Sequence, residues 1–268
     1  MSILRDQLFF GDKIVRHNLI PLALFLIFAS HISSAQTFTS TEQQVPLIEL
    51  YTSEGCSSCP PADRYLSQLS DEKGLWEEFV PIAFHVDYWD YIGWKDPYAS
   101  KEYSQRQRRY AAEYRETTVY TPGLRKAGEE WRSWRIFGNP RLDSDEAGNP
   151  GVLKIAVNND GLFEADFTAQ DTSESVQLTV ALLGLNLSNE VTRGENRGKT
   201  LEHDFVVLGI STYSSANSGE WSGQLPAASV DAPNYAIAAW VTQGGSLVPI
   251  QATGGLISID QSQPLAKN

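Results

Sequence analysis

Hydrophobic and polar positions follow two different patterns along the chain. In the first part, short apolar runs at residues 45–51 and 80–86 alternate with segments of helical period at residues 60–70 and 97–116. Strands that alternate with helices are typical of a layered α/β fold. The pattern therefore predicts an α/β domain over residues 44–145, with an aromatic and helical insert at residues 88–116.

The second part of the chain reads as strand after strand. Asp160-Gly161 and Gly244-Gly245 stand where hairpin turns are needed. The strand-like runs occupy residues 152–157, 162–167, 176–183, 200–212, 235–242 and 247–252. This pattern predicts a β-rich domain over residues 150–262, an antiparallel β-sandwich or barrel. The acidic, Gly- and Pro-containing stretch Leu142–Gly151 is the expected boundary, so the fold class is α/β followed by all-β.

The N-terminal residues 1–35 have the pattern of a signal peptide. Lys13 and Arg16 precede an apolar run at residues 19–29, and Ala35 ends a small-residue segment that is typical of a cleavage site. The run is short for a membrane span, although an uncleaved anchor stays open as an alternative. We expect cleavage, a periplasmic or secreted protein, and no stable membrane insertion afterwards.

Charge narrows the classes of partner. The chain carries 33 acidic and 21 basic residues, a net charge of −12 at pH 7. A chain this acidic is repelled by phosphate backbones and anionic membranes, which argues against nucleic acid as a partner. With 2 cysteines in 268 residues the protein is not a disulfide-stapled small fold.

Those two cysteines form the motif Cys56-Ser57-Ser58-Cys59, between a predicted strand and a predicted helix. A C-x-x-C pair at the start of a helix is typical of a dithiol redox site, because the free backbone N–H groups of the first turn stabilise a thiolate. We assign Cys56 as the attacking sulfur and Cys59 as the resolving one, joined as a disulfide in the oxidised form.

Two other interpretations of the pair stay open. An inert disulfide is possible in an oxidising compartment, although so small a ring removes little chain entropy. A metal site would need further ligands from His85, Asp87 or His203, and no second ligand motif accompanies them. We therefore predict no metal and no cofactor.

Several motifs resemble one family. They are the segment around the cysteines, two segments that follow the second strand, and one in the β-rich part: residues 50–63 (LYTSEGCSSCPPAD), 84–90 (FHVDYWD), 93–97 (GWKDP) and 194–201 (GENRGKTL). Together they are similar to the secreted thioredoxin-like proteins of domain-of-unknown-function family 1223. The resemblance implies a thioredoxin-like first domain and no settled function.

The resemblance implies two site residues beside the cysteines, and the position of a third in the chain makes it a candidate. Thioredoxin-like proteins keep a cis-proline next to the dithiol, so Pro122 is the matching candidate and Thr121 the residue that contacts the substrate backbone. Asp87, at the exit of a predicted strand, is the candidate acid for proton transfer to and from the resolving thiol. The stretch Gly123–Gly128 departs from the pattern, since it is polar where such folds have an apolar strand.

Two further segments favour ordinary structural interpretations. The aromatic residues of the insert, such as Tyr103 and Tyr110, recur at helical spacing and are expected to pack against the α/β layer rather than to form a ligand groove. The basic loop at residues 193–203 is explained by a polar hairpin connection, with a binding loop as the alternative.

Taken together, the sequence predicts an exported thiol–disulfide oxidoreductase acting on protein thiols and disulfides or on a small thiol. The alternative is a secreted binding module on a thioredoxin-like scaffold with an inert disulfide. A third hypothesis is a thiol-dependent peroxidase, for which Cys56 needs a nearby arginine such as Arg106.

Overall fold

A computed structural model describes residues 35–135, 148–169, 175–214 and 219–258. All of these residues fall in one compact unit, residues 33–268. The helices are α1 (Pro60–Gln68) and α2 (Lys101–Glu113), with the short 3-10 helices η1 (Leu69–Asp71), η2 (Asp87–Ile92) and η3 (Ser133–Arg135). The strands are β1 (Gln36–Thr39), β2 (Leu47–Thr52), β3 (Val80–His85), β4 (Gly123–Lys126), β5 (Glu129–Glu130), β6 (Gly151–Val157), β7 (Leu162–Ala169), β8 (Val176–Leu185), β9 (Leu187–Glu190), β10 (Thr200–His203), β11 (Val206–Ser214), β12 (Glu220–Gln224), β13 (Asn234–Gln243) and β14 (Pro249–Ile257).

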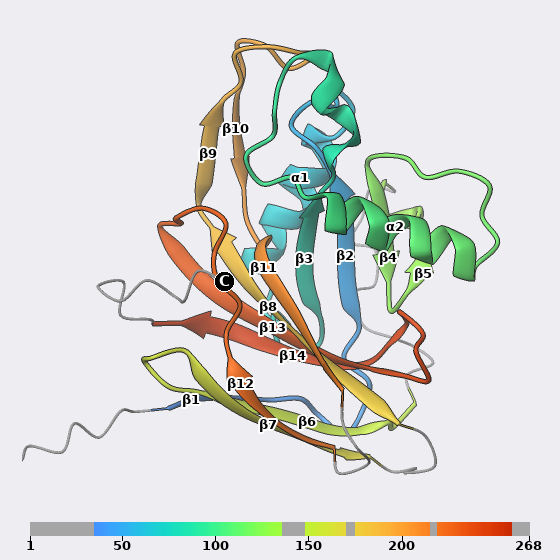
Figure 1. The fold of residues 1–268 in the computed structure, drawn as a ribbon, viewed down its shortest axis with the longest axis vertical. Helices are drawn as coiled ribbons and strands as arrows, with labels where there is room; N and C mark the ends of the chain where they lie inside the picture. Colours follow the sequence, from blue (N-terminus) through green and yellow to red (C-terminus); the bar gives the residue numbers. More distant parts are fainter. Residues whose placement is uncertain (1–34, 136–147, 170–174, 215–218, 259–268) are drawn as a thin grey trace, which may run out of the picture. The chain divides into compact units, whose positions relative to one another are not determined.

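The main element is an eight-stranded sheet in the order β14-β13-β8-β11-β3-β2-β4-β5. Strand β3 runs parallel to both of its neighbours, β2 and β11. On either side of these three strands the pairing is antiparallel, between β11 and β8 and between β2 and β4. Central strands such as β8 are buried on both faces, which explains why they read as continuous apolar runs. In Figure 1 this sheet crosses the molecule from the blue and teal strands β2 and β3 to the red strand β14.

Two core clusters lie on the two faces of that sheet. Ala181 and Leu183 of β8 belong to the cluster that includes residues of α1 and α2. Val180 and Leu182, which alternate with them, pack against the four-stranded sheet β1-β6-β7-β12. Since successive side chains of a strand point to opposite faces, one strand supplies both cores.

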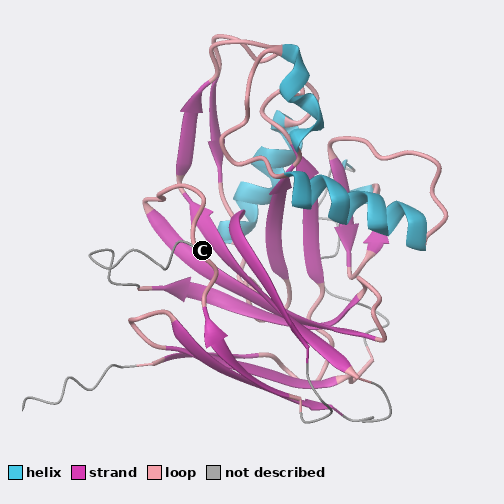
Figure 2. Ribbon diagram, in the orientation of Figure 1, coloured by secondary structure: helices cyan, strands magenta, loops and turns pink. Residues whose placement is uncertain are grey.

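The fold class predicted from the sequence is wrong. Strands predominate over helices among the described residues, as the magenta ribbons of Figure 2 show, and the expected thioredoxin-like α/β fold is replaced by this mostly β arrangement. Strand β11 of the second half enters the same sheet as β3, with Val206 opposite Ala83 and the Ala83 N–H donating to the Phe205 carbonyl at 2.8 Å. Hydrophobic periodicity identifies strands but does not tell which strand edges pair.

Individual elements were predicted with mixed success. The elements expected at residues 45–51, 60–70 and 80–86 are confirmed as β2, α1 and β3, with small differences at their ends. The single strand expected at residues 200–212 is wrong, because β10 and β11 are separated at Phe205, whose φ is +58°. The predicted signal peptide and the domain boundary near residue 145 fall almost wholly outside the described residues. Within the described part of the chain, none of the helices combines the length and the apolar composition that a bilayer crossing needs.

Candidate functional site

The two cysteines lie at the turn between β2 and α1. Cys59 is the N-cap residue of α1, and Pro60 and Pro61 occupy the first helical positions, where a missing N–H costs no intrahelical hydrogen bond. Cys56 and Cys59 form a disulfide, with their Cα atoms 5.4 Å apart. The predicted strand–loop–helix arrangement and the disulfide are therefore confirmed.

Both cysteines are buried, with exposures of 1% for Cys56 and 0% for Cys59. Next to Cys56, Gly55 packs against η2, because a Cβ built on Gly55 would lie only 3.0 Å from the Cβ of Trp89. A larger residue at position 55 would force Trp89 to shift. Exchange at Cys56 consequently needs movement of the groups that cover it.

A second group that contacts the cysteine turn comes from the β9–β10 hairpin, which stands apart from the large sheets in Figure 1. The Asn196 side-chain amide donates to the carbonyl oxygens of Glu54, at 2.8 Å, and of Cys56, at 3.0 Å. The Ser57 N–H donates to the Glu195 carboxylate at 3.0 Å. Hydrogen bonding from the Ser57 side chain, and then from its backbone, lowers the pKa of Glu195. The loop between β9 and β10 thus holds the dithiol turn from 140 residues away in sequence.

The loop was noticed in the sequence as part of the motif at residues 194–201, but its partner was not found. Its polar side chains made a hairpin connection the simpler interpretation. The structure assigns two of them, Glu195 and Asn196, to the cysteine turn. The available sequence signal for this contact was that residues 50–63 and 194–201 both belong to the motifs that resemble one family.

Glu54, two residues before Cys56, is a fully buried carboxylate. It accepts hydrogen bonds from the Trp94 indole N–H at 2.8 Å and the Asn189 amide at 2.9 Å, and its Oε1 lies 3.1 Å from His203 Nε2. A buried carboxylate needs such donors to offset its lost hydration. The Glu54 carboxylate therefore bonds to Trp94, which follows η2, and to Asn189 and His203 of the β9–β10 hairpin.

A second buried pair lies beside it. His85 Nδ1 is 2.8 Å from Asp96 Oδ2, which also accepts the Glu54 N–H at 2.9 Å. Burial disfavours protonation of His85, but the Asp96 carboxylate outweighs it and raises the pKa of His85. Burial likewise opposes ionisation of Asp96, yet His85 holds the pKa of Asp96 below its ordinary value. The His203 ring packs edge-on against His85 at 4.9 Å between centroids.

Asp63, which the sequence analysis missed, is a buried acid on the helix that begins at the cysteines. It follows Cys59 by four residues on α1, so both side chains lie on one helix face. Thr52 donates to its Oδ1 at 2.7 Å, while its Oδ2 is buried without a partner in the described structure. Burial raises the pKa of Asp63, and nearby His203 and His85 offset this only in part. The i, i+4 spacing from Cys59 was the available signal.

Asp87, the predicted proton-transfer residue, has different partners. The Asp87 carboxylate accepts a hydrogen bond from the Ser104 hydroxyl of α2. The Asp87 backbone N–H donates to the Ser104 hydroxyl oxygen at 3.1 Å. No hydrogen bond among the described residues joins Asp87 to either cysteine. Asp87 instead ties the start of η2 to α2.

Thr121 and Pro122, the predicted substrate contacts, lie one side chain away from the dithiol turn. The Thr121–Pro122 peptide bond is cis. The Trp89 indole N–H donates to Thr121 Oγ1 at 2.8 Å, and Trp89 is the residue that approaches Gly55. Trp89 therefore connects the proline segment to the cysteine turn.

Arg106, the arginine considered for peroxidase chemistry, is engaged elsewhere. Its guanidinium pairs with the buried Glu49 carboxylate at 2.9 Å and lies over the rings of Phe84, Tyr110 and Trp240. Tyr103 and Tyr110 of the same helix are buried in the core, as predicted for the aromatic stripe. These contacts hold Arg106 in the core, where it pairs with Glu49 and not with Cys56.

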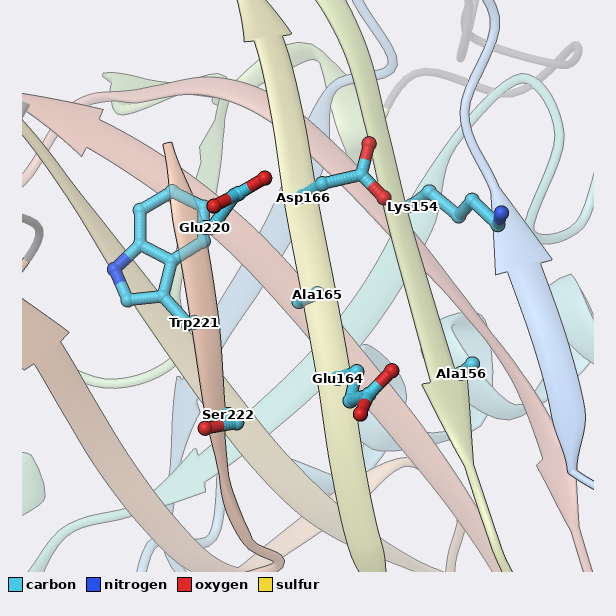
Figure 3. Close-up of a pocket in the computed structure, with 8 residues that line it drawn as sticks. All are labelled: Lys154, Ala156, Glu164, Ala165, Asp166, Glu220, Trp221 and Ser222. Carbon is cyan, nitrogen blue, oxygen red and sulfur yellow. The ribbon is translucent and has the colours of Figure 1, made fainter. Parts of the chain in front are cut away.

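The surface has two hollows of interest besides the covered disulfide. One, of about 390 Å³, lies on the four-stranded sheet (Figure 3). The residues that line it include Lys154 of β6, Glu164 and Asp166 of β7, and Ser222 of β12. The other, of about 300 Å³, lies beside Pro122. Across the described ranges, no group of three or more His, Cys, Asp or Glu side chains is arranged to hold a metal ion.

The sequence matches a family profile described as "Protein of unknown function (DUF1223)" over residues 47–242. The fold is similar to the crystal structure of protein AGR_C_4864 from Agrobacterium tumefaciens, with a TM-score of 0.56, 24% identity, and coverage of 82% of this chain and 97% of that one. HBP35 of Porphyromonas gingivalis is similar with a TM-score of 0.52 and 14% identity, over 85% of this chain and 79% of that one. At these identities the likeness concerns the fold alone. No curated protein matches the sequence.

Proposed function

The chain belongs to the DUF1223 family of proteins of unknown function, and we propose from its own residues that it is a thiol–disulfide oxidoreductase acting through Cys56 and Cys59. The family expected from the sequence motifs is thereby confirmed. The substrates we propose are protein thiols and disulfides or a small thiol. No metal or cofactor enters the proposed chemistry, because two sulfurs suffice for a two-electron exchange.

The observation that carries the proposal is the placement of Asp63. A disulfide with only a structural role has no use for a buried carboxyl that lacks a partner on one oxygen, one helical turn beyond Cys59. Such a group costs folding free energy, and a role in the chemistry would account for its presence. Because burial raises the pKa of Asp63, its carboxylate is a stronger base than an ordinary aspartate, which suits it to exchanging a proton with a thiol.

In the reducing direction the exchange proceeds in two displacements. The Cys56 thiolate attacks one sulfur of the substrate disulfide, a mixed disulfide forms, and the first substrate thiolate leaves. Asp63 then takes the proton of the Cys59 thiol, and the Cys59 thiolate attacks Cys56 Sγ. The Cys56–Cys59 disulfide forms, the second substrate thiolate leaves, and the substrate has gained two electrons. The reverse sequence oxidises a dithiol.

Access to Cys56 in this mechanism depends on the groups that contact the cysteine turn. Trp89 lies against Gly55, and Glu195 and Asn196 bond to the backbone of Ser57 and Cys56. The β9–β10 pair forms a two-stranded sheet of its own, so it can shift without breaking the ladders of the large sheet. We propose that this loop opens when a partner binds.

The place of action we propose is the periplasm or the cell exterior. A disulfide persists in an oxidising compartment, whereas cytosolic reductants keep most thiols reduced. The signal-like pattern of residues 19–35 supports the same location.

A trapping experiment tests this function. In a Cys59→Ser variant the mixed disulfide on Cys56 has no resolving thiol, so we expect partners of the exported fraction to accumulate as reductant-sensitive adducts. The matched Cys56→Ser variant lacks the attacking sulfur and is expected to trap none. Free monomer alone with both variants would contradict the function.

Burial of both sulfurs favours a second candidate function, a secreted binding module whose disulfide is inert. Exposures of 1% and 0% are ordinary for a structural bond. The hollow on the four-stranded sheet in Figure 3 would then be a candidate ligand surface. This alternative predicts that ligand binding survives replacement of both cysteines, which the oxidoreductase proposal does not require.

A further inference from the structure

The hollow beside Pro122 combines an aromatic floor with basic groups. Its lining comes from the segment before β4, from β4 itself and from the residues around η3: Tyr120, Pro122, Leu124, Trp131, Arg132, Trp134 and Arg135. Its volume is about 300 Å³. Two guanidinium groups at one hollow are notable in a chain with a net charge of −12.

The aromatic floor is held in place from below. Tyr65 of α1 packs against Trp131 and Trp134, with ring centroids 6.0 Å and 5.7 Å apart. Trp131 is 9% exposed, and Trp134 is half-buried with the Arg135 guanidinium 5.2 Å above its ring. Rings fixed in this way present a preformed apolar surface, which lowers the entropic cost of binding.

The two arginines differ in how far they are neutralised. Arg132 pairs with Glu130 at 3.0 Å, and Glu130 also accepts the Tyr120 hydroxyl. The Tyr120 bond keeps the pKa of Glu130 low, so Glu130 stays ionised and neutralises one cation. Arg135 instead lies over the Trp134 ring at 5.2 Å. The two guanidinium groups of the lining, against the single carboxylate of Glu130, give the hollow a net positive charge that favours an acidic ligand.

The position of the hollow relates it to the disulfide. Pro122 lines it, Thr121 accepts the Trp89 indole N–H, and Trp89 lies against Gly55, next to Cys56. A ligand that reaches both the hollow and Cys56 must therefore extend past Trp89 and Pro122. An extended polypeptide meets this requirement, and a small thiol reaches only one of the two places.

We propose that this hollow binds an acidic, extended segment of a polypeptide partner, with an aromatic or aliphatic side chain on the Trp131 and Trp134 floor and a carboxylate at Arg132 and Arg135. The site gives the proposed oxidoreductase its substrate class, and for that purpose it rests on the proposed function. Binding itself involves no sulfur, so it can be measured separately.

The test uses fluorescence polarisation of a labelled, cysteine-free peptide of alternating Glu and Phe, with the wild-type protein. A peptide with Lys in place of Glu is expected to bind at least about tenfold more weakly. The double variant R132Q/R135Q is expected to lose about tenfold in affinity for the Glu peptide, which is the effect of removing two partly exposed ion pairs. The control R109Q removes an exposed arginine of α2 and is expected to change affinity by less than about twofold.

Three results would overturn the site. Equal affinity for the Glu and Lys peptides removes the charge recognition, and unchanged affinity in R132Q/R135Q places binding elsewhere. Competition by glutathione as strong as that of the unlabelled peptide makes a small thiol the ligand instead of a polypeptide. If the Glu peptide binds as expected but Cys59→Ser traps no partner, the site stands and the proposed function fails.

Discussion

The side-chain amide of Asn196 donates a hydrogen bond to the carbonyl oxygen of Cys56 at 3.0 Å. One residue lies at the tip of a β-hairpin in the second half of the chain and the other in the dithiol turn of the first half. The same amide holds the Glu54 carbonyl at 2.8 Å, so one side chain fixes both ends of the Glu54–Cys56 segment. The two halves of the protein therefore share one candidate site.

We expect Asn196→Ala to destabilise the protein and to open the disulfide to reductants. Two buried carbonyls lose their donor, which costs about 1–3 kcal/mol for each group left unpaired. Urea unfolding measures the loss, and the rate of disulfide reduction by dithiothreitol measures access. Asn234→Ala, an exposed residue that bonds Asn186, is the control. Wild-type reduction kinetics in Asn196→Ala would show that this loop does not cover Cys56.

Asp63→Asn is expected to stabilise the protein at neutral pH. Because the folded-state pKa of Asp63 is raised, the folded state binds the proton more tightly, and stability falls as pH rises from the ordinary Asp value to the raised one. The asparagine keeps the Thr52 bond and removes this slope. The gain at pH 7 is about 1.4 kcal/mol for each unit of raised pKa. Urea unfolding from pH 4 to 8 measures it, and parallel curves for both proteins would be evidence against a raised pKa.

The same substitution is expected to slow the chemistry. Without the Asp63 carboxylate the Cys59 thiol has no nearby base, and loss of general base catalysis costs roughly 100-fold or more. The measurement is the decay of a mixed disulfide formed between reduced protein and a chromogenic aromatic disulfide. Asp87→Asn serves as the control, since Asp87 bonds Ser104. Equal slowing by both variants would remove Asp63 from the proposed role.

Asp96→Asn is expected to destabilise the protein most between about pH 4 and pH 6.5. The raised pKa of His85 contributes stability that is fully present below its unfolded value and is lost as pH rises through the folded pKa. The lowered pKa of Asp96 contributes stability above its unfolded value that is lost as pH falls. Breaking a buried pair costs about 3–5 kcal/mol. A loss that does not vary with pH would mean that His85 is not protonated in the fold.

Glu195→Gln is expected to make the Cys56 thiol more acidic. The carboxylate occupies the Ser57 N–H, a donor that could otherwise face a Cys56 thiolate, and it adds a negative charge beside it. The pH dependence of Cys56 alkylation in the reduced protein measures the thiol pKa. Glu202→Gln on the neighbouring strand β10 changes the net charge equally and is the control. A Cys56 pKa that is unchanged in Glu195→Gln would rule out this influence.

Local features of the site could be predicted, while the contacts across the fold could not. The disulfide turn follows from spacing at a strand–helix junction, and the cis Thr121–Pro122 bond followed from the family resemblance. Gly123–Lys126 is polar for a strand, yet β4 pairs with β2, and its buried Arg125 is neutralised by Glu116 at 2.6 Å. Such compensation lies in tertiary contacts, which periodicity does not contain.

The proton-transfer residue illustrates the same limit. Asp87 was chosen because it ends a strand, and its true partner Ser104 comes from a different helix. Asp63 could have been found from its helical spacing to Cys59 alone. Glu195 and Asn196 could not have been found in this way. Their partners Ser57 and Glu54 lie 138 and 142 positions earlier in the chain, and the residues around Glu195 and Asn196 do not indicate these contacts.

The most direct test of the oxidoreductase proposal is the redox midpoint of the Cys56–Cys59 pair. The purified protein is equilibrated in glutathione buffers of graded potential, its free thiols are alkylated, and the fraction oxidised is read by mass. We predict a reversible midpoint between about −120 and −270 mV, the range of working dithiol couples. A disulfide that stays closed below about −300 mV would be structural and would contradict the proposal.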